Sequence, residues 1–277
     1  TDIWHTASES NEYLQSGWIG RYLDEHQKNP FDAIEVDESL SLAMKGETVN
    51  GIATIDAQRL FRTAQAPFFK NVLKNQNEEN LNEHNLGYLY KTMISAEYSA
   101  KYIYETSKTY SSSQEYPNSN FANQLKTIAQ FINSGLSTNV YFSSLGGFDT
   151  HANQENTQKR LLTQYAEGIS AFVKDLNKKD TFKDTLILTF SEFGRRVKQN
   201  AANGTDHGAA NNIFVIGKHL KMQGLYNDLA NLDDLDRNGD LKFEIDFRSL
   251  YTTVLEKWLK VDANAIINKD LKSLNFI

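Results

Sequence analysis

The sequence contains no cysteine and only three prolines among its 277 residues. The absence of cysteine excludes disulfide bonds, thiolate zinc sites and a cysteine nucleophile. No run of apolar residues approaches the length that crosses a bilayer, so the sequence predicts no membrane span. Basic residues are outnumbered by acidic ones, with 29 Lys and Arg against 35 Asp and Glu and a net charge of −6. Because phosphate binding depends largely on Lys and Arg, this balance argues against a nucleic-acid partner.

The composition that remains is ordinary for a folded globular protein, with 40% hydrophobic and 23% charged residues. A chain of 277 residues can bury a sizeable core in one large domain or two small ones. The sequence opens on TDIWHTASES without an initiator Met. We therefore expect a mature or trimmed product, whose upstream sequence could have carried an export signal.

Apolar residues at helical spacing dominate the N-terminal half of the sequence. They predict helices over 56–73, over 81–107 and over 121–134. Asp56 stands at the N-cap position of the first of these helices. We therefore expect residues 37–134 to form a helical elaboration within the domain.

After Gly135 the pattern changes to an alternation of strands and helices. Apolar and β-branched runs predict strands over 138–145, 184–190 and 212–217. The run over 184–190 is nearly continuously apolar, as expected for a strand buried on both faces of a parallel sheet. Such alternation indicates βαβ units. We expect a single α/β domain over 1–277, with a mostly parallel central sheet flanked by helices.

Polar side chains collect in the loops next to these predicted strands. GGFDTHANQ follows the first strand, SEFGRR follows the second, and NGTDHGAANN leads into the third. Ligands in open α/β sheets bind outside the carboxyl ends of the strands, so we expect the three loops to meet at one edge. The candidate metal ligands in these loops are Asp149, His151, Glu192, Asp206 and His207.

Carboxylates with a few imidazoles suit a divalent metal, with Zn²⁺ or Mn²⁺ the expected cofactor. Two such ions about 4 Å apart could polarise a phosphoryl or sulfuryl oxygen and stabilise the attacking and leaving oxygens. Arg195 follows Glu192 closely, and a guanidinium fork matches a tetrahedral anion. Arg195 is therefore the candidate that holds a substrate anion.

Each motif also has a purely structural interpretation. Asp149 or Thr150 could cap the helix that follows. Glu192 and Arg195 could form a local surface ion pair of small value. His207 could lie in an ordinary loop with its ring satisfied by a backbone carbonyl. The coincidence of three such clusters at related strand ends favours a site.

A second candidate cation site lies in LDDLDRNGDLKFEIDF. Its residues match the first seven positions of an EF-hand calcium loop, but the twelfth is Ile245, where a bidentate Glu is required. We therefore expect a turn built on Asn-Gly rather than a calcium site. The calcium ligands would be Asp234, Asp236, Asn238 and Asp240.

Metal-free serine chemistry is a further alternative. Ser143, Ser144 and Ser191 lie near predicted strand ends. None of them has the Gly-x-Ser-x-Gly surroundings of a nucleophile elbow, which disfavours this alternative.

Four segments, taken in order, resemble a known family: GGFDTHANQ, LTFSEFGRRVKQN, GTDHGAAN and DFRSLYTTVLEKWL. They resemble the bacterial proteins grouped as domain of unknown function 1501, members of the alkaline phosphatase-like (sulfatase-like) superfamily. WHTASES and GWIGRYLDE extend the resemblance over essentially the whole chain. It implies an alkaline phosphatase-like fold with one or two metal ions at the strand ends, in a superfamily of phosphatases, phosphodiesterases, sulfatases and phosphomutases.

The resemblance also implies roles for individual residues. Asp149 and His151 are similar to the Asp/His pair that binds one metal ion. TLILTFSEFG is similar to the strand that normally ends in Ser-Asp-His-Gly, and it carries Glu192 and Phe193 in place of the Asp-His pair. His207 is similar to the later histidine ligand of the superfamily.

The superfamily's nucleophile follows the first strand of the sheet, and the sequence has no such strand before TDIWHTA. By this resemblance we expect the N-terminal strand and the nucleophile to lie upstream of the chain. The expected function is metal-dependent hydrolysis of a small-molecule or glycan-linked phosphate or sulfate ester, in a protein exported to the periplasm or cell envelope. The alternative is a catalytically degenerate binding or scaffold protein of the bacterial envelope.

Overall fold

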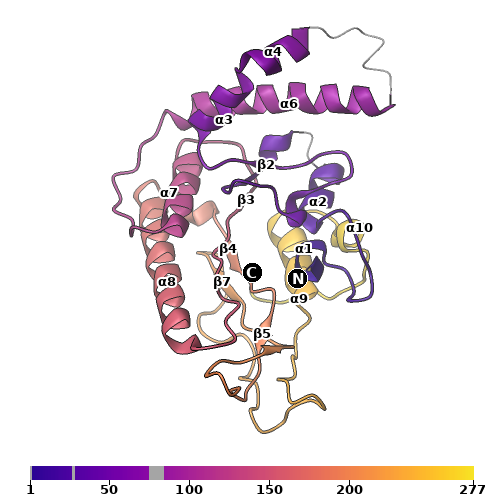
Figure 1. Ribbon diagram of the computed structural model, residues 1–277, viewed down its shortest axis with the longest axis vertical. Coiled ribbons are helices and arrows are strands. Elements are labelled where there is room, and N and C mark those ends of the chain that lie inside the picture. Colours follow the sequence, from indigo (N-terminus) through magenta and orange to yellow (C-terminus); the bar gives the residue numbers. More distant parts are fainter. Residues whose placement is uncertain (1, 27–28, 75–83) are drawn as a thin grey trace. The chain divides into compact units, whose positions relative to one another are not determined.

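The computed structural model describes residues 2–26, 29–74 and 84–277, and it describes side chains except for those of 72–74 and 84–92. The chain mixes helices and strands, in keeping with the predicted α/β class (Figure 1). It divides into two compact units, which are described separately. Unit 1 comprises Thr1–Leu14, Leu145–Glu167 and Asn177–Ile277, and unit 2 comprises Gln15–Ser144 and Gly168–Leu176.

Unit 2 contains a small parallel sheet. Its strands are β1 (Ala33–Glu35), β2 (Ile52–Ala53) and β3 (Val140–Phe142), in the order β2-β1-β3. Ile34 of β1 lies opposite Ile52 on one side and Tyr141 on the other, and both pairs are parallel. The central strand is buried throughout, as parallel strands covered on both faces require. The strand predicted over 138–145 is present as the shorter β3.

Helices make up most of the rest of unit 2. The predicted helix over 56–73 is instead two helices, because Pro67 has no N–H to continue the first one and opens the second. Asp56 caps the first helix as predicted, and its side chain accepts a hydrogen bond of 2.6 Å from the N–H of Arg59. The helical segments of this unit are α2 (Trp18–His26), η1 (Pro30–Asp32), η2 (Leu42–Met44), α3 (Ala57–Ala64), α4 (Pro67–Lys74), α6 (His84–Ser107) and α7 (Asn120–Asn133).

A buried carboxylate fixes the loop before α7. Asp175 lies in the part of α8 (Gln154–Lys178) that belongs to unit 2, and it is fully buried. Its two oxygens accept hydrogen bonds from the hydroxyl groups of Tyr110 at 3.0 Å, Ser112 at 2.6 Å and Tyr116 at 3.0 Å. Burial, and then the charge of Asp175, raise the pKa of Tyr116 far above its usual range. The three hydroxyl groups therefore stay protonated and tie this loop to α8.

The strands of unit 1 are antiparallel, which corrects the prediction of a parallel sheet here. Strand β4 (Ile187–Thr189) pairs with β7 (Phe214–Ile216), and both are only partly buried. A parallel pair needs a crossover of a dozen or more residues, usually a helix, whereas the chain between these two strands contains no helix. It contains instead the short antiparallel pair β5 (Gly194–Arg195) and β6 (His207–Gly208).

Aromatic side chains pack the ends of unit 1 together. Trp4 of α1 (Asp2–Thr6) stacks on Phe190 at 5.6 Å and on Phe247 at 4.1 Å between ring centroids. The buried Tyr251 donates a hydrogen bond of 2.9 Å to the carbonyl of Trp4. The remaining helical segments are η3 (Thr181–Asp184), α9 (Phe247–Thr253), η4 (Val254–Trp258) and α10 (Ala263–Ile267).

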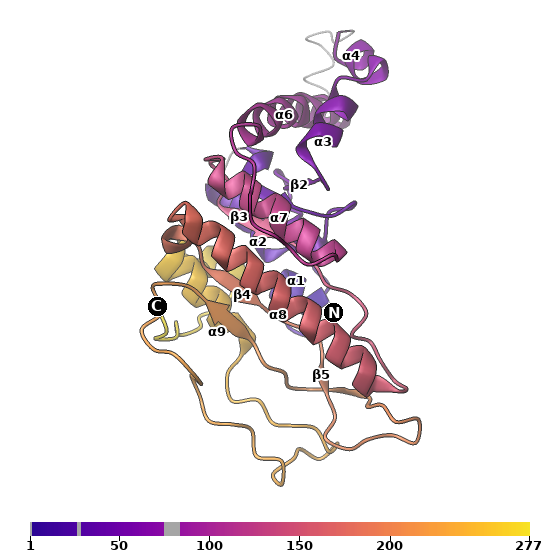
Figure 2. The same ribbon diagram turned by 90° about the vertical axis from the view of Figure 1, so that its left-hand side faces the viewer.

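The chain between β7 and α9 has neither helix nor strand and runs in long loops (Figure 2). These loops carry the Asp234–Asp240 segment that resembles a calcium loop. Over the described residues, no helix combines the length and the apolar character that a bilayer crossing requires.

Candidate metal centre

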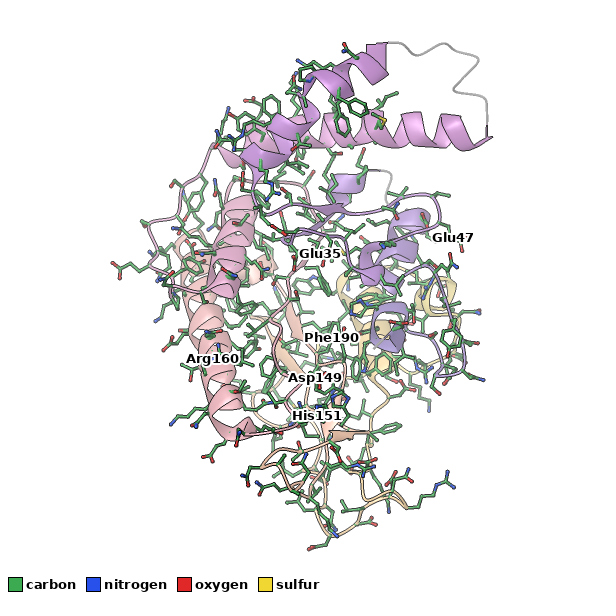
Figure 3. All side chains as sticks on the ribbon, viewed as in Figure 1. Glu35, Glu47, Asp149, His151, Arg160 and Phe190 are labelled. Carbon is green, nitrogen blue, oxygen red and sulfur yellow. The ribbon has the colours of Figure 1, made fainter. Side chains whose placement is uncertain are left out.

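Three of the predicted ligands lie together in unit 1: Asp149, His151 and His207. One potential ligand atom from each falls within 4.8 Å of the others. Oδ1 of Asp149 lies 2.7 Å from Nε2 of His207 and 3.3 Å from Nδ1 of His151. Asp149 and His151 lie close together in the segment that precedes α8 (Figure 3). The side chains are 63%, 51% and 43% exposed, respectively, so the cluster is open to solvent.

The cap interpretation of Asp149 does not apply to this geometry. Helix α8 begins at Gln154, so neither Asp149 nor Thr150 stands immediately before it. His207 opens β6 and lies opposite Arg195 of β5. The ring of His207 is hydrogen-bonded to the Asp149 carboxylate. The interpretation of His207 as an ordinary loop residue predicted a backbone carbonyl as this partner.

Arg195 connects the two segments that carry the cluster. Its Nη1 donates hydrogen bonds of 2.7 Å to the carbonyl oxygens of Thr150 and Thr205, and its Nη2 donates to the carbonyl of Phe148. Burial lowers the pKa of Arg195, while the charge of Asp149 opposes that effect. Arg195 pairs with backbone carbonyls rather than with Glu192, and it holds the segment around Asp149 against the segment that leads into His207.

A close backbone approach holds His151 in the same place. A Cβ on Gly204 would lie 2.4 Å from the carbonyl carbon and oxygen of His151, so only glycine fits at this position. The side-chain amide of Asn200 donates a hydrogen bond of 2.9 Å to the same carbonyl of His151. The loop before β6 is therefore attached to the backbone of a candidate ligand.

Phe193 contributes a contact that sequence reasoning missed. Its ring stacks on the ring of His207, with centroids 4.0 Å apart and planes inclined by 12°. By the resemblance alone, Phe193 stands only in the place of an imidazole. No sequence signal marks this contact, because it depends on the pairing of the two-residue strands β5 and β6.

The electrostatics of the cluster keep Asp149 ionised. The hydrogen bond from His207 lowers the pKa of Asp149, and the charges of His207, His151 and Arg195 lower it further. Asp149 is therefore a carboxylate at neutral pH and can act as an anionic ligand.

The donor set suits a transition-metal ion, and two of its three separations lie near the spacing of a tetrahedral site. Bonds of ~2.0–2.1 Å in tetrahedral geometry separate neighbouring ligand atoms by about 3.3 Å. The 3.3 Å between Asp149 and His151 matches this value, and the 2.7 Å between Asp149 and His207 needs a small widening. Two imidazoles and one carboxylate form the ligand set of catalytic zinc sites that keep one open position.

The structure does not bring the other two predicted ligands into the cluster. Oε1 of Glu192 lies 2.8 Å from Nε2 of His5, which is only 16% exposed, and this hydrogen bond lowers the pKa of Glu192. Asp206 is exposed, and its backbone carbonyl accepts a hydrogen bond of 3.1 Å from the N–H of Arg196. Among the described residues, Asp149, His151 and His207 are the only group of three or more such side chains with this spacing.

The acidic loop over 234–240 is a turn whose carboxylates have separate partners. Oδ1 of Asp236 accepts hydrogen bonds from the N–H groups of Asn238 at 2.8 Å and Asp240 at 2.9 Å. The ammonium of Lys242 binds Asp234. Asp240 is buried and lies 3.3 Å from Nε of Arg196. The hydrogen bonds of Asp236 thus close a turn around Asn238 and Gly239.

Two of the candidate serines are engaged in local hydrogen bonds. Ser191 donates a hydrogen bond of 2.9 Å to the carbonyl of Phe193. Ser144 donates a hydrogen bond of 3.1 Å to the carboxylate of Asp37 in unit 2. Neither contact is the serine–histidine contact that a hydrolytic nucleophile requires.

Comparisons with known proteins identify the family. No curated protein and no solved structure matches the chain. A family described as "Protein of unknown function (DUF1501)" matches residues 4–269, which is nearly the whole sequence. The chain therefore belongs to the DUF1501 family.

Proposed function

We propose that this protein binds one divalent metal ion at Asp149, His151 and His207 and hydrolyses phosphate or sulfate esters there. The observation that carries the proposal is the convergence of a carboxylate and two imidazoles within 4.8 Å. The substrate class rests on the resemblance to the alkaline phosphatase-like superfamily. By the same resemblance, the protein acts in the periplasm or cell envelope.

Zn²⁺ or Mn²⁺ is the metal that suits this donor set. When bound, such an ion polarises an ester oxygen and lowers the pKa of a water molecule. Asp149 supplies the negative charge of the site, and the two imidazoles supply nitrogen donors. The exposure of all three side chains leaves room for a substrate on the solvent side.

Arg195 contributes positive charge to the site in this proposal. Its Nη atoms donate hydrogen bonds to backbone carbonyls. It therefore attracts an ester anion through its charge rather than through a bidentate hydrogen bond. The positive charge of Arg195 acts on the cluster, since it is one of the charges that lower the pKa of Asp149.

A second candidate function is that of a catalytically degenerate binding or scaffold protein of the bacterial envelope. The hydrogen bond between Glu192 and His5 favours it, because this carboxylate already has a side-chain partner. Phe193, at the place of the superfamily's imidazole, also favours it, because a phenyl ring offers no ligand atom.

The test is hydrolysis of 4-nitrophenyl phosphate and 4-nitrophenyl sulfate in the presence of Zn²⁺ or Mn²⁺. We expect activity with one ester, its loss in His151→Ala, and wild-type rates in His219→Ala, which removes an exposed histidine outside the cluster. Equal rates in wild type and His151→Ala would contradict the hydrolase. Metal binding without turnover of either ester would support the scaffold.

A further inference from the structure

We infer that Phe193 is a positioning residue that holds the imidazole of His207 in the orientation required at the metal centre. This inference rests on the proposed metal site and adds a residue to it that offers no ligand atom. The contact that carries it is a nearly parallel stack with ring centroids 4.0 Å apart.

The β5–β6 pair explains why the two rings meet. Arg195 lies directly opposite His207, and Gly194 lies opposite Gly208. Side chains alternate along an extended strand, so Phe193 and Arg195 share the face that carries His207, with Phe193 as the diagonal neighbour. A two-residue pairing therefore places an aromatic ring against a candidate ligand.

The ring of Phe193 is itself held in place. The guanidinium carbon of Arg195 lies 5.1 Å from the centre of that ring, within the range of a cation–π contact. Arg195 is anchored by carbonyls of Phe148, Thr150 and Thr205. A Cβ on Gly194 would lie 1.7 Å from the carbonyl oxygen of Ala210, so the backbone next to Phe193 is packed against that segment.

His207 needs such a support because it is 43% exposed. An exposed imidazole turns about its side-chain bonds, and a ligand must lose that freedom before it binds a metal ion. The hydrogen bond to Asp149 fixes one edge of the ring, and the stack on Phe193 fixes one face. Groups that orient a ligand in this way commonly change metal affinity by ~10–100-fold when they are removed.

The test compares Phe193→Leu, which keeps an apolar side chain without a ring, with Phe193→Tyr, which keeps the ring. Phe243→Leu is the control, because Phe243 is 65% exposed in the loop before α9. The first measurement is the proton NMR spectrum of the metal-free protein, in which the His207 signals are assigned by their loss in His207→Ala. We expect these signals upfield in wild type and Phe193→Tyr and shifted downfield in Phe193→Leu.

The second measurement is the Zn²⁺ dissociation constant, determined by competition with a chromophoric chelator. We expect an increase of ~10–100-fold in Phe193→Leu. Phe193→Tyr and Phe243→Leu should stay near wild type. Circular dichroism checks that each variant is folded, and if Phe193→Leu is unfolded, Phe193→Trp against Phe193→Met replaces the comparison.

Unchanged His207 signals and unchanged zinc affinity in Phe193→Leu would overturn the inference. A loss of zinc affinity that Phe193→Tyr does not restore would also contradict it, because a ring would then be insufficient. If the wild type binds no zinc, the proposed function fails. In that case the NMR comparison alone decides whether Phe193 positions His207 against Asp149.

Discussion

Oδ1 of Asp149 lies 2.7 Å from Nε2 of His207, a residue 58 positions further along the chain. The same oxygen lies 3.3 Å from Nδ1 of His151. One carboxylate oxygen is therefore shared by two imidazoles, and this contact joins the segment before α8 to the β5–β6 pair. The metal site, the role of Phe193 and the predictions about the cluster all depend on this contact.

Asp149→Asn should raise the Zn²⁺ dissociation constant more than about a hundredfold. This loss of affinity is larger than the one usually caused by removing a residue that only orients a ligand. The amide removes the only negative charge among the three candidate ligands. Competition with a chromophoric chelator measures the dissociation constant. Asp184→Asn, at an exposed carboxylate of the same unit, is the control. Equal zinc affinity in Asp149→Asn and wild type would remove Asp149 from the site.

Gly204→Ala should displace the loop before β6 from His151. The new Cβ would lie 2.4 Å from the backbone of His151, so the loop or the ligand must move. We expect a loss of about 1–3 kcal/mol in stability, the usual cost of overpacking, and weaker zinc binding. Gly146→Ala is the matched control, because its Cβ would meet nothing within 4 Å. Indistinguishable behaviour of the two variants in thermal unfolding and zinc titration would refute this packing argument.

The His5–Glu192 pair should make stability depend on pH in the acid range. The hydrogen bond from His5 lowers the pKa of Glu192 in the folded protein. Its stabilising contribution is therefore complete above the unfolded pKa of about 4.3 and is lost as the pH falls through the folded value. Urea unfolding from about pH 7 down to about pH 3 should show a steeper loss in wild type than in Glu192→Gln.

Two variants sharpen that experiment. His5→Gln should flatten the acid dependence as Glu192→Gln does, since either change breaks the same pair. Glu167→Gln, at an exposed carboxyl of α8, should leave the wild-type slope intact. Identical slopes in wild type and Glu192→Gln would show that the pair contributes nothing to folding.

Asp175→Asn should destabilise unit 2 by about 1–3 kcal/mol, the cost of leaving a buried polar group unsatisfied. The amide nitrogen would face a hydroxyl group where an oxygen now accepts hydrogen bonds from Tyr110, Ser112 and Tyr116. The free energy of unfolding in urea measures the effect. Lys174→Gln, the exposed neighbour on the same helix, is the control. A difference below about 0.5 kcal/mol would mean that the loop before α7 does not depend on this carboxylate.

Local sequence patterns predicted the parts of this structure that depend on neighbouring residues. Asp56 caps α3 as predicted, and strand β3 lies within the predicted run. Three of the five predicted ligands, Asp149, His151 and His207, come together in the structure. Asp149 and His151 are two positions apart in sequence, so their proximity follows from a local pattern.

Local sequence patterns did not predict contacts between residues that are far apart in the sequence. Nothing near Glu192 indicates that its partner is His5, 187 residues earlier, so the pair could not be predicted. The direction of β4 and β7 was predicted wrongly, because a continuous apolar run does not distinguish a parallel strand from an antiparallel one. The role of Phe193 depends on the pairing of β5 with β6, which two-residue strands do not reveal in sequence.

The most direct test of the metal site is the zinc content of the purified protein after equilibrium dialysis against Zn²⁺. We predict about one ion per chain in wild type and a loss of that ion in both His151→Ala and His207→Ala, with His219→Ala unchanged. A wild type without zinc, or equal zinc in wild type and the two cluster variants, would contradict a metal centre at Asp149, His151 and His207.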